Sequence, residues 1–357
     1  MRDSHRKKEA TAIRRAILRR RRRRRRRFFL LLELIILLIL VGSTYLYSKF
    51  DLMNYQSLEH KNLEVYKDTG NYTNIALFGL DSREGELDGG VRSDCMMIAS
   101  INHKTDEVKI ISVYRDTLLR QSDGSYSKAN SAYSYGGPAE AIALLNRNLD
   151  LDIQKYISVD FNAMVDIVDA LGGVEIDVQE EEIIYINGYS TEITKVTGVD
   201  TQPVVSTGPQ TLNGVQATAY ARIRYTSGDD FKRTERQRLV LQKIVEKAQQ
   251  SDLATLNQII NDVLPQISTN LTAKNFLGLA ANGLKYKIGE MSGFPFDVTT
   301  SENVRGLSGS YVIPIGLSDN VSQLHAFLFD KSEYPPSDQV QEINDDIEYL
   351  SGVNSIN

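Results

Sequence analysis

The stretch NIALFGL, residues 74–80, decides the fold class together with two runs that follow it. CMMIASI (95–101) and EVKIISVY (107–114) are equally short and apolar, as buried strands are. The segments between the runs, DSREGELDGG and NHKTDE, have the composition of turns. The pattern predicts three strands of one sheet that run up, down and up.

Strands and helices alternate further along the chain. YISVD (156–160) and GVEIDV (173–178) read as strands, and FNAMVDIVDALGG (161–173) as an amphipathic helix that ends at glycine. Strands that alternate with helices predict an α/β sandwich. Further helices are expected at 138–149, 231–250, 252–263, 273–284 and 319–329, and a strand at 309–315.

The charge distribution divides the chain. Residues 1–27 carry fifteen Lys and Arg against two acidic residues, whereas the remaining 330 residues have a net charge of −18. Between these parts, residues 28–47 are mostly Leu and Ile and long enough to cross ~30 Å of hydrocarbon. Because Lys and Arg that flank a first span stay in the cytoplasm, we expect a single-pass membrane protein with residues 48–357 outside.

Two other interpretations of the N-terminus are less favoured. A cleaved secretory signal has a similar layout, but this apolar run is longer and has no small-residue cleavage site. The run Arg19–Arg27 could bind nucleic acid, but a topology signal that contacts anionic lipid explains it more simply. Cys95 is the only cysteine, so no disulfide can form within the chain.

The expected organisation has six parts. These are a basic cytoplasmic head (1–27), a transmembrane helix (28–47), an extracellular stalk (48–70), a catalytic domain (71–250), a helical and strand part that packs on it (251–334), and an acidic tail (335–357).

Charged residues flank the first three strands at the ends that a meander would bring to one edge. They are Asp81 and Arg83 after the first strand, Arg92 and Asp94 before the second, and Arg115 and Asp116 after the third. Since neighbouring strands lie ~4.8 Å apart, three strands span about 10 Å, a width that suits a pyrophosphate.

A second group of cations lies in RIRYTSGDDFKRTERQR, residues 222–238. If RIR is extended, Arg222 and Arg224 project on the same side. In the helix that follows, steps of four back from the apolar Leu241 lead to Gln237 and Arg233 on the buried face. A buried arginine needs a partner.

The same helical spacing predicts that Arg236 and Arg238 point towards solvent.

The simplest alternative is that these arginines and aspartates only pair with each other. Composition argues against it, because eleven arginines follow residue 27 and eight of them belong to these motifs. The planar guanidinium suits bidentate phosphate binding. Asp81 and Asp94 offer the oxygen ligands that Mg²⁺ prefers, with phosphate oxygens and water completing its coordination.

Six motifs, in order over residues 72–250, resemble the LytR-CpsA-Psr family. They are GLDSREGE, RSDCMMIASIN, SVYRDT, KANSAYSYGGP, VDFNAMVDIVDALGGVEIDV and YARIRYTSGDDFKRTERQR. The resemblance implies an α/β/α sandwich with a central mixed sheet, and a groove for a polyprenyl chain. It further implies Mg²⁺-dependent transfer of a glycopolymer, such as teichoic acid or capsule, from undecaprenyl pyrophosphate to a peptidoglycan hydroxyl, usually the muramic acid 6-hydroxyl.

The resemblance also implies roles for individual residues. Asp81 and Asp94 match acidic positions associated with Mg²⁺ and with activation of the acceptor, and Arg115 is expected to take part in catalysis. The positions expected to bind the pyrophosphate are Arg115, Arg222, Arg224, Arg233 and Gln237, with Arg83 and Arg92 inside matching motifs.

Two alternative functions stay open. The same arginines and metal would serve a hydrolase that passes the lipid pyrophosphate to water. A non-catalytic envelope regulator or lipid sensor belongs to a different class, and the outward placement of the motif charges weighs against it.

Overall fold

The computed structural model describes residues 44, 48–49, 53–82, 87, 90–224 and 229–354. The chain divides into two units, Met1–Asp51 and Leu52–Asn357, and only the second is considered below. The predicted basic head and, apart from Thr44, the predicted span lie outside the described residues. No helix within the described part is long and apolar enough to cross a membrane.

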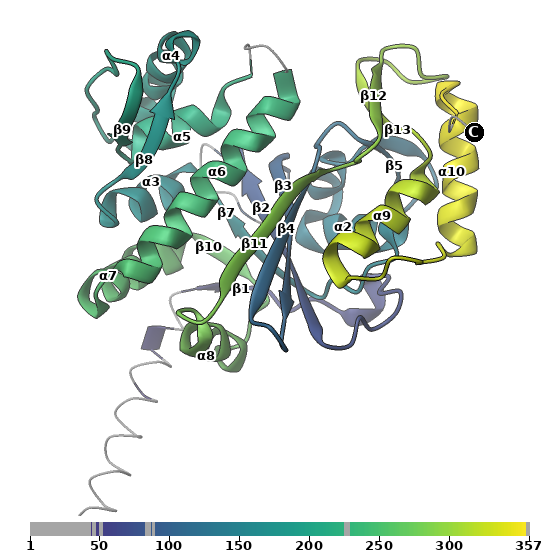
Figure 1. Cartoon of the computed structure of the whole chain (residues 1–357), viewed down its shortest axis with the longest axis horizontal. Coiled ribbons are helices and arrows are strands. Elements are labelled where there is room, and N and C mark those ends of the chain that lie inside the picture. Colours follow the sequence, from purple (N-terminus) through teal and green to yellow (C-terminus); the bar gives the residue numbers. More distant parts are fainter. Residues whose placement is uncertain are drawn as a thin grey trace, which may run out of the picture. The chain divides into compact units, whose positions relative to one another are not determined.

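The predicted meander is confirmed at the centre of a seven-stranded sheet (Figure 1). The meander consists of β2 (Tyr72–Leu80), β3 (Ser93–Asn102) and β4 (Glu107–Val113). Each of these strands pairs antiparallel with the next one along the chain. β7 (Lys155–Val159) lies parallel to β2. The sheet is therefore mixed, with the order β1-β10-β7-β2-β3-β4-β11. The outer strands are β1 (Asn54–Tyr55), β10 (Ile267–Thr269) and β11 (Lys287–Phe294).

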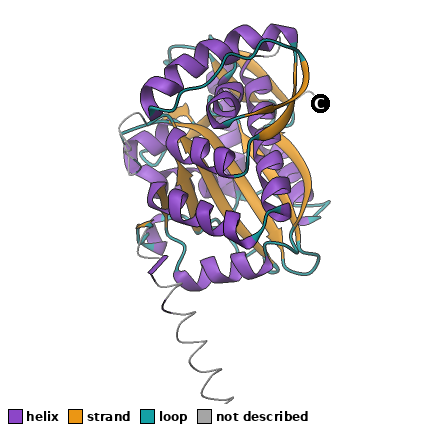
Figure 2. Ribbon diagram, turned by 90° about the vertical axis from the view of Figure 1, so that its left-hand side faces the viewer, coloured by secondary structure: helices purple, strands orange, loops and turns teal. Residues whose placement is uncertain are grey.

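Alternating side chains of β2 give the sheet two apolar faces. Phe78 and Leu80 enter a core shared with α2 (Ser131–Leu149), α9 (Leu317–Phe329) and α10 (Asp338–Ser351). Ile75 enters the opposite core, against which residues of α6 (Asp229–Gln250) and α8 (Ala273–Asn282) pack. Helices therefore cover both faces of the sheet, as Figure 2 shows, and the predicted α/β architecture is confirmed.

A third core lies beside the central sheet. It joins α3 (Phe161–Ala170), β8 (Val174–Val178), α4 (Glu180–Thr197), β9 (Gly208–Leu212) and α5 (Gly214–Arg222). β8 and β9 form an antiparallel pair. The sequence analysis assigned no element to residues 180–221, so α4, β9 and most of α5 were missed.

The extended RIR segment was predicted wrongly at its first residue. α5 runs through Arg222, and the chain becomes extended only at Ile223. A capping box at Asn213 starts this helix: the Asn213 side chain accepts a hydrogen bond from the Gln216 N–H, and the Gln216 side chain accepts one from the Asn213 N–H. A helix start signal nine residues before Arg222 outweighed the local pattern of RIR.

Two peripheral segments contribute buried residues. In the predicted stalk, Met53 and Leu63 are buried. In the predicted acidic tail, Val340, Ile343 and Ile347 of α10 are buried in the core that α10 shares with α2 and α9.

The remaining elements are η1 (His60–Asn62), β5 (Leu118–Arg120), β6 (Tyr126–Lys128), α7 (Leu253–Val263), η2 (Leu264–Gln266), β12 (Val298–Ser301) and β13 (Tyr311–Pro314).

Candidate functional site

The meander brings charged residues from three strands to one edge of the sheet. The register pairs Gly79 with Cys95, and the Asp81 N–H points to the Arg92 carbonyl at 3.5 Å, so Asp81, directly after β2, and Asp94, at the start of β3, lie at the same edge of the sheet. Arg115, two residues after β4, donates from Nη1 to Asp94 Oδ1 at 2.7 Å. The structure thus brings Asp81, Asp94 and Arg115 together, as the charge pattern predicted.

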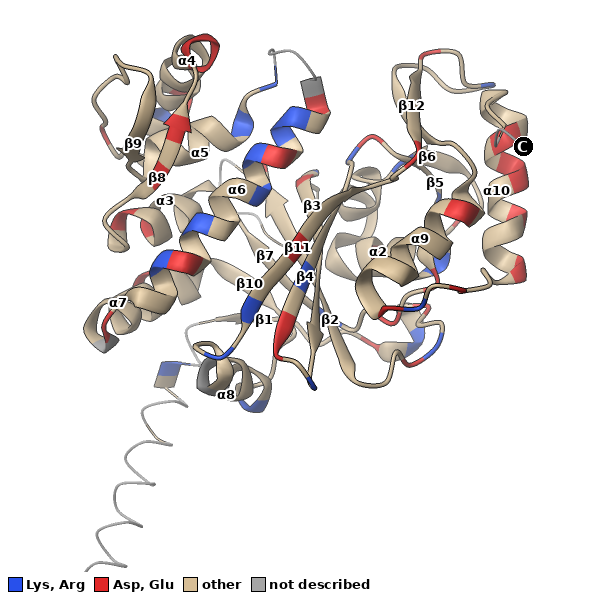
Figure 3. Cartoon of the chain, viewed as in Figure 1, with Lys and Arg blue, Asp and Glu red and all other residues tan. Residues whose placement is uncertain are grey.

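The N-terminal part of α6 adds the second group of charges. Arg233 is only 3% exposed, with its Nη1 3.9 Å from Asp94 Oδ2. Its Nη2 lies 2.8 Å from Oδ1 of Asp230, which belongs to the first turn of the same helix. Arg115 Nε and Arg224 Nε each lie 3.6 Å from the same oxygen. Figure 3 shows how basic and acidic residues alternate along α6.

Asp230 is therefore the centre of the cluster, although it was not among the site residues predicted from the sequence. It lies in the motif SGDDFKRTERQR, where helical spacing places it one turn before Arg233. That spacing was a usable signal, but nothing local shows that Arg115 and Arg224 converge on the same carboxylate.

The two central groups of the cluster, Asp230 and Arg233, are largely buried and incompletely hydrogen-bonded among the described residues. Burial raises the pKa of the Asp230 carboxyl, although Arg233 and Arg115 oppose the shift. Burial also lowers the pKa of the Arg233 guanidinium. Among the described residues, neither Asp230 oxygen makes a well-directed hydrogen bond, and Arg233 Nε and Asp81 Oδ1 have no hydrogen-bond partner. Unsatisfied buried polar atoms are costly, so these groups are suited to bind a polar ligand.

Arg115 is held differently. Burial alone would lower the pKa of its guanidinium, but the carboxylates of Asp94, Asp230 and Asp116 together raise it. Asp116 Oδ1 lies 3.7 Å from Arg115 Nε and 3.3 Å from Lys128 Nζ. Arg115 therefore stays charged and tied to the edge of the sheet.

A cavity of about 440 Å³ opens beside this cluster and runs between the sheet and α3, α5 and α6. Its wall is largely apolar, with Met97 from β3, Met164 and Ile167 from α3, and Val240 and Ile244 from α6. Its polar lining includes Asp81, Asp94, Arg222, Arg224, Arg233 and Gln237. One hollow thus combines a charged end with an apolar body.

Arg222 reaches this cavity from the end of α5. Its guanidinium lies over the rings of Phe161 and Tyr189, 4.7 and 5.1 Å from their centroids, and Nη1 is 3.4 Å from Glu192 Oε2. The aromatic rings fix the plane of the guanidinium by cation–π contact. Their role was not visible in the sequence, because they lie 61 and 33 residues before Arg222.

The prediction that Arg236 and Arg238 point to solvent is wrong for Arg236. Arg236 is 6% exposed, its Nε donates to Glu182 Oε1 at 2.8 Å, and its Nη1 donates to the Ile223 carbonyl at 3.3 Å. Arg238 is half-buried, and burial lowers the pKa of its guanidinium. α6 packs on two sides, against the sheet and against α4 and α5, so its buried face is wider than one stripe.

One of the predicted phosphate ligands is not part of this arrangement. Arg92 is exposed and does not line the cavity. Arg83 lies outside the described residues.

Two carboxylates of the site, Asp81 and Asp94, were expected to hold Mg²⁺. Among the described residues, no three His, Cys, Asp or Glu side chains form a group that could hold a metal ion by themselves. Magnesium bound to phosphates commonly needs only one or two protein carboxylates. Asp81 and Asp94 on neighbouring strands, with Asp81 Oδ1 buried and without a hydrogen-bond partner among the described residues, fit that kind of site.

Cys95 also lines the cavity but is not suited to nucleophilic chemistry. Burial raises the pKa of its thiol to about 12, so the reactive thiolate is scarce at neutral pH.

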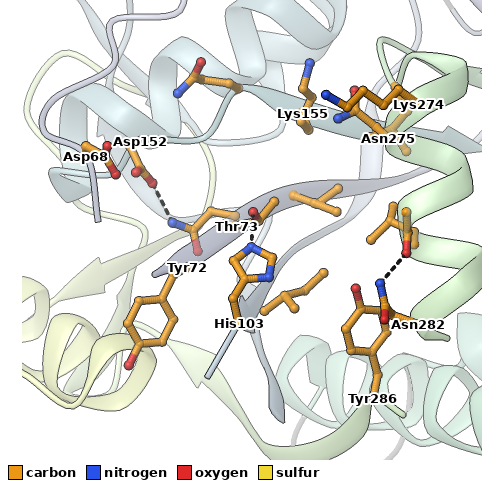
Figure 4. Close-up of a pocket in the computed structure, with 17 residues that line it drawn as sticks. Asp68, Tyr72, Thr73, His103, Asp152, Lys155, Lys274, Asn275, Asn282 and Tyr286 are labelled. Atoms are coloured by element: carbon orange, nitrogen blue, oxygen red, sulfur yellow. Dashed lines mark hydrogen bonds between the residues drawn. The ribbon is translucent and has the colours of Figure 1, made fainter. Parts of the chain in front are cut away.

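A second cavity of about 440 Å³ lies at the other end of the meander (Figure 4). It is the more polar of the two cavities and is called the polar cavity below: Thr73 Oγ1 and His103 Nε2 lie 2.7 Å apart, and Lys155 and Lys274 also line it. None of the residues that the sequence analysis proposed for the site lines this second cavity.

Comparison with known proteins agrees with the fold and the motifs. A model of the LytR_cpsA_psr family matches residues 41–320. The polyisoprenyl-teichoic acid–peptidoglycan teichoic acid transferase TagU of Bacillus mycoides is 31% identical over 255 residues, which are 68% of this chain and 78% of that protein. For other curated relatives the match spans less than two thirds of the relative's own length, for example 49% and 62%.

Solved structures share the fold at low identity. The protein gbs0355 of Streptococcus agalactiae superposes with a TM-score of 0.61 at 24% identity, covering 78% of this chain and 93% of that one. YwtF (TagT) of Bacillus subtilis, solved with bound octaprenyl pyrophosphate lipid, superposes with a TM-score of 0.50 at 21% identity, covering 80% and 93%. With the family match over residues 41–320, these findings identify the chain as a member of the LytR_cpsA_psr family.

Proposed function

We propose that this chain transfers a glycopolymer from a polyprenyl-pyrophosphate carrier to a peptidoglycan hydroxyl, the muramic acid 6-hydroxyl, with formation of a phosphodiester. The observation that carries the proposal is the single cavity in which Asp94 and Arg233 adjoin an apolar wall. A polyprenyl pyrophosphate has the matching combination of a charged head and a long apolar chain. Two relatives agree with it, since TagU is named a teichoic acid transferase and YwtF (TagT) was solved with octaprenyl pyrophosphate.

In this proposal the arginines bind the pyrophosphate. Arg233 reaches it from α6, and Arg224 from the segment between α5 and α6. Arg222 presents a guanidinium fixed by Phe161 and Tyr189. Phosphoryl transfer depends mainly on positioning and on neutralising charge, so several preorganised guanidiniums are the main catalytic asset. Without a ligand, Asp230 pairs with Arg224 and Arg233, and Asp94 lies near Arg233.

The bond changes follow from the substrates. The acceptor oxygen forms a bond to the phosphorus that carries the glycopolymer, the P–O–P bond breaks, and polyprenyl phosphate leaves. Asp81 takes the acceptor proton, because Asp94 is already paired with Arg115 at 2.7 Å. Mg²⁺ held by Asp81 and Asp94 would supply further neutralisation of phosphate charge.

The location is part of the proposal. Residues 28–47 would anchor the chain in the cell membrane, with the basic head inside and residues 48–357 in a Gram-positive type of envelope. A reporter fused after Asn357 should be active outside the cytoplasm. Activity only in the cytoplasm would contradict both the orientation and the substrate.

The decisive experiment uses the full-length chain in detergent with a lipid-linked glycopolymer donor and a peptidoglycan oligomer. We expect polymer to appear on the glycan when Mg²⁺ is present. Release of polymer to water at the same rate with and without the oligomer would instead identify a lipid-pyrophosphate hydrolase. Absence of any donor turnover, with donor binding intact, would favour a non-catalytic lipid sensor.

A further inference from the structure

Tyr135 is a large aromatic side chain on the surface next to the candidate site. It is 75% exposed, more than Tyr349 at 67% and Tyr55 at 43%. Aromatic rings usually contribute to stability by being buried, so an exposed ring in a fixed position is a candidate for ligand contact.

The start of α2 places this ring close to Arg115. The Asn130 N–H donates to the Arg115 carbonyl at 3.0 Å, and the Ala129 N–H donates to the Thr117 carbonyl at 2.9 Å. α2 begins at the next residue, Ser131. At ~1.5 Å per residue, Tyr135 lies roughly 7 Å along the helix from Asn130.

The backbone leaves the regular helix directly after Tyr135. Gly136 and Gly137 interrupt the helix with non-helical dihedral angles, and φ of Gly137 is +64°, a value that suits glycine. A Cβ atom at Gly136 would lie 2.6 Å from Glu140 Cβ, so a larger residue there would force a shift. On the other side, the Gly90 N–H donates to the Ser134 carbonyl at 3.3 Å.

Side chains near the start of α2 connect this part of the surface with the charge cluster. Lys128 Nζ lies 3.3 Å from Asp116 Oδ1 and 5.4 Å from the centroid of the Tyr311 ring. Burial, Asp116 and then Tyr135 itself raise the pKa of the Tyr311 phenol, which agrees with a position of Tyr135 nearby. Tyr311 and Lys128 therefore form an aromatic and basic margin that continues from Arg115 through Asp116, and Tyr135 lies in the first turns of α2, close to the backbone contact of Asn130 with Arg115.

We propose that Tyr135 is a stacking platform for a sugar ring that lies next to the pyrophosphate site. The flat face of a tyrosine suits the C–H face of a pyranose, and Lys128, which lies near Asp116 and Tyr311, suits the hydroxyl or phosphate groups around such a ring. The proposal rests on the proposed function, in which sugars border the reacting phosphate on both sides. The ring belongs either to the glycopolymer or to peptidoglycan.

The test compares Tyr135→Ala, Tyr135→Phe and the matched surface control Tyr349→Ala in the full-length chain. KM is measured for the lipid-linked donor and for the peptidoglycan oligomer. Loss of one aromatic contact should raise KM for one substrate about three- to tenfold in Tyr135→Ala. Tyr135→Phe keeps the ring face and should behave as wild type, and so should Tyr349→Ala.

The affected substrate identifies the sugar. A higher KM for the oligomer assigns the platform to peptidoglycan, and a higher KM for the donor assigns it to the glycopolymer. If Tyr135→Ala changes neither KM, or if Tyr135→Phe is as impaired as Tyr135→Ala, the platform is refuted.

A binding experiment separates this proposal from the proposed function. Saturation-transfer NMR with a peptidoglycan oligosaccharide and with a short teichoic acid fragment needs no turnover. A signal with wild type that is lost in Tyr135→Ala and kept in Tyr135→Phe supports the platform even if transfer is never observed. Equal signals in wild type and Tyr135→Ala for both saccharides would overturn it.

Discussion

Two cavities of equal size, about 440 Å³, lie at opposite ends of the central meander. The apolar cavity is bordered by the end of β2 and the start of β3, and the polar cavity by the start of β2 and the end of β3. Their volumes do not distinguish them. The difference lies in how their charged groups are satisfied.

In the polar cavity, the Asp152 carboxylate is occupied by hydrogen bonds within the protein. Asp152 accepts hydrogen bonds from the Thr69 N–H at 2.7 Å and the Thr69 hydroxyl at 2.8 Å, and Asn74 Nδ2 donates to its other oxygen. Among its described lining atoms, Asn74 Oδ1 is buried without a partner.

In the apolar cavity, the charges are close together but poorly satisfied. Asp81 Oδ1 and Arg233 Nε, and the Asp230 oxygens next to them, lack hydrogen bonds among the described residues. Groups that the fold itself does not satisfy are the ones available to a ligand. We therefore expect substitutions in the apolar cavity to change activity, and those in the polar cavity to change stability.

The largest contrast is expected between two carboxylates. Asp94→Asn removes the partner of Arg115 and a proposed metal ligand, so turnover should fall about a hundredfold or more with little change in Tm. Asp152→Asn should keep turnover and lose about 1–3 kcal/mol of unfolding free energy, because one of its donors faces an amide instead. Steady-state rates and chemical denaturation measure both. Equal turnover of the two variants would remove Asp94 from the mechanism.

A smaller effect is expected from the shape of one cation. Arg233→Lys keeps the charge but loses the fork that binds a phosphate at two points, so turnover should fall about ten- to a hundredfold. Lys232→Arg, one residue away on the exposed side of α6, is the control and should be neutral. Arg238 is not a suitable control, because it is half-buried. If Arg233→Lys is as active as wild type, a bidentate phosphate contact is excluded.

The apolar wall can be tested by filling it. Met164→Trp narrows the apolar cavity and should raise donor KM about five- to twentyfold for a long polyprenyl chain, and less for a short one. Leu279→Trp makes the same kind of change in the polar cavity and should leave donor KM unchanged. The comparison of the two chain lengths is the measurement. An equal effect of both variants would show that the lipid does not occupy the apolar cavity.

The smallest effect on activity is expected when Asp230, the carboxylate at the centre of the cluster, is neutralised. Asp230→Asn should lower donor KM about two- to fivefold near pH 7, because the anion that competes with phosphate for three guanidiniums is lost.

The pH dependence has a definite sign. Burial raises the folded pKa of Asp230 above its unfolded value, so its ionisation removes folding free energy as pH rises through the folded pKa. Protonation at acidic pH therefore makes wild type resemble Asp230→Asn. Donor KM of wild type should therefore fall towards that of the variant as the pH is lowered from neutral through the raised pKa of Asp230. A difference that stays constant over this range would show that Asp230 does not compete with the donor.

Much of the fold was predictable because its signals are local. The runs around Phe78, Ile98 and Ile111 are short, apolar and separated by turns, and all three form the meander. The same pattern brought Asp81, Asp94 and Arg115 to one edge, because antiparallel pairing alone puts them there. Helix α10 was missed because the segment is acidic overall, although Val340, Ile343 and Ile347 have helical spacing.

The amino-acid sequence by itself determined the three strands of the meander, the charged edge, and the inward face of α6 that carries Arg233 and Gln237. These features depend on periods of two and 3.6 residues, which can be read within a short window. The motifs in their order also identified the family.

Only the tertiary structure decided how the buried charges are compensated. Arg236 is buried because Glu182, 54 residues earlier, meets it at 2.8 Å, and Arg222 lies over Phe161 and Tyr189 because α5 packs beside α3 and α4. Periodicity tells which face of a helix is covered, but the partner that makes a buried charge tolerable comes from a distant part of the chain. Burial without a partner is too costly for a charged group. The long-range packing therefore determines which arginines stabilise the fold and which are available to bind a ligand.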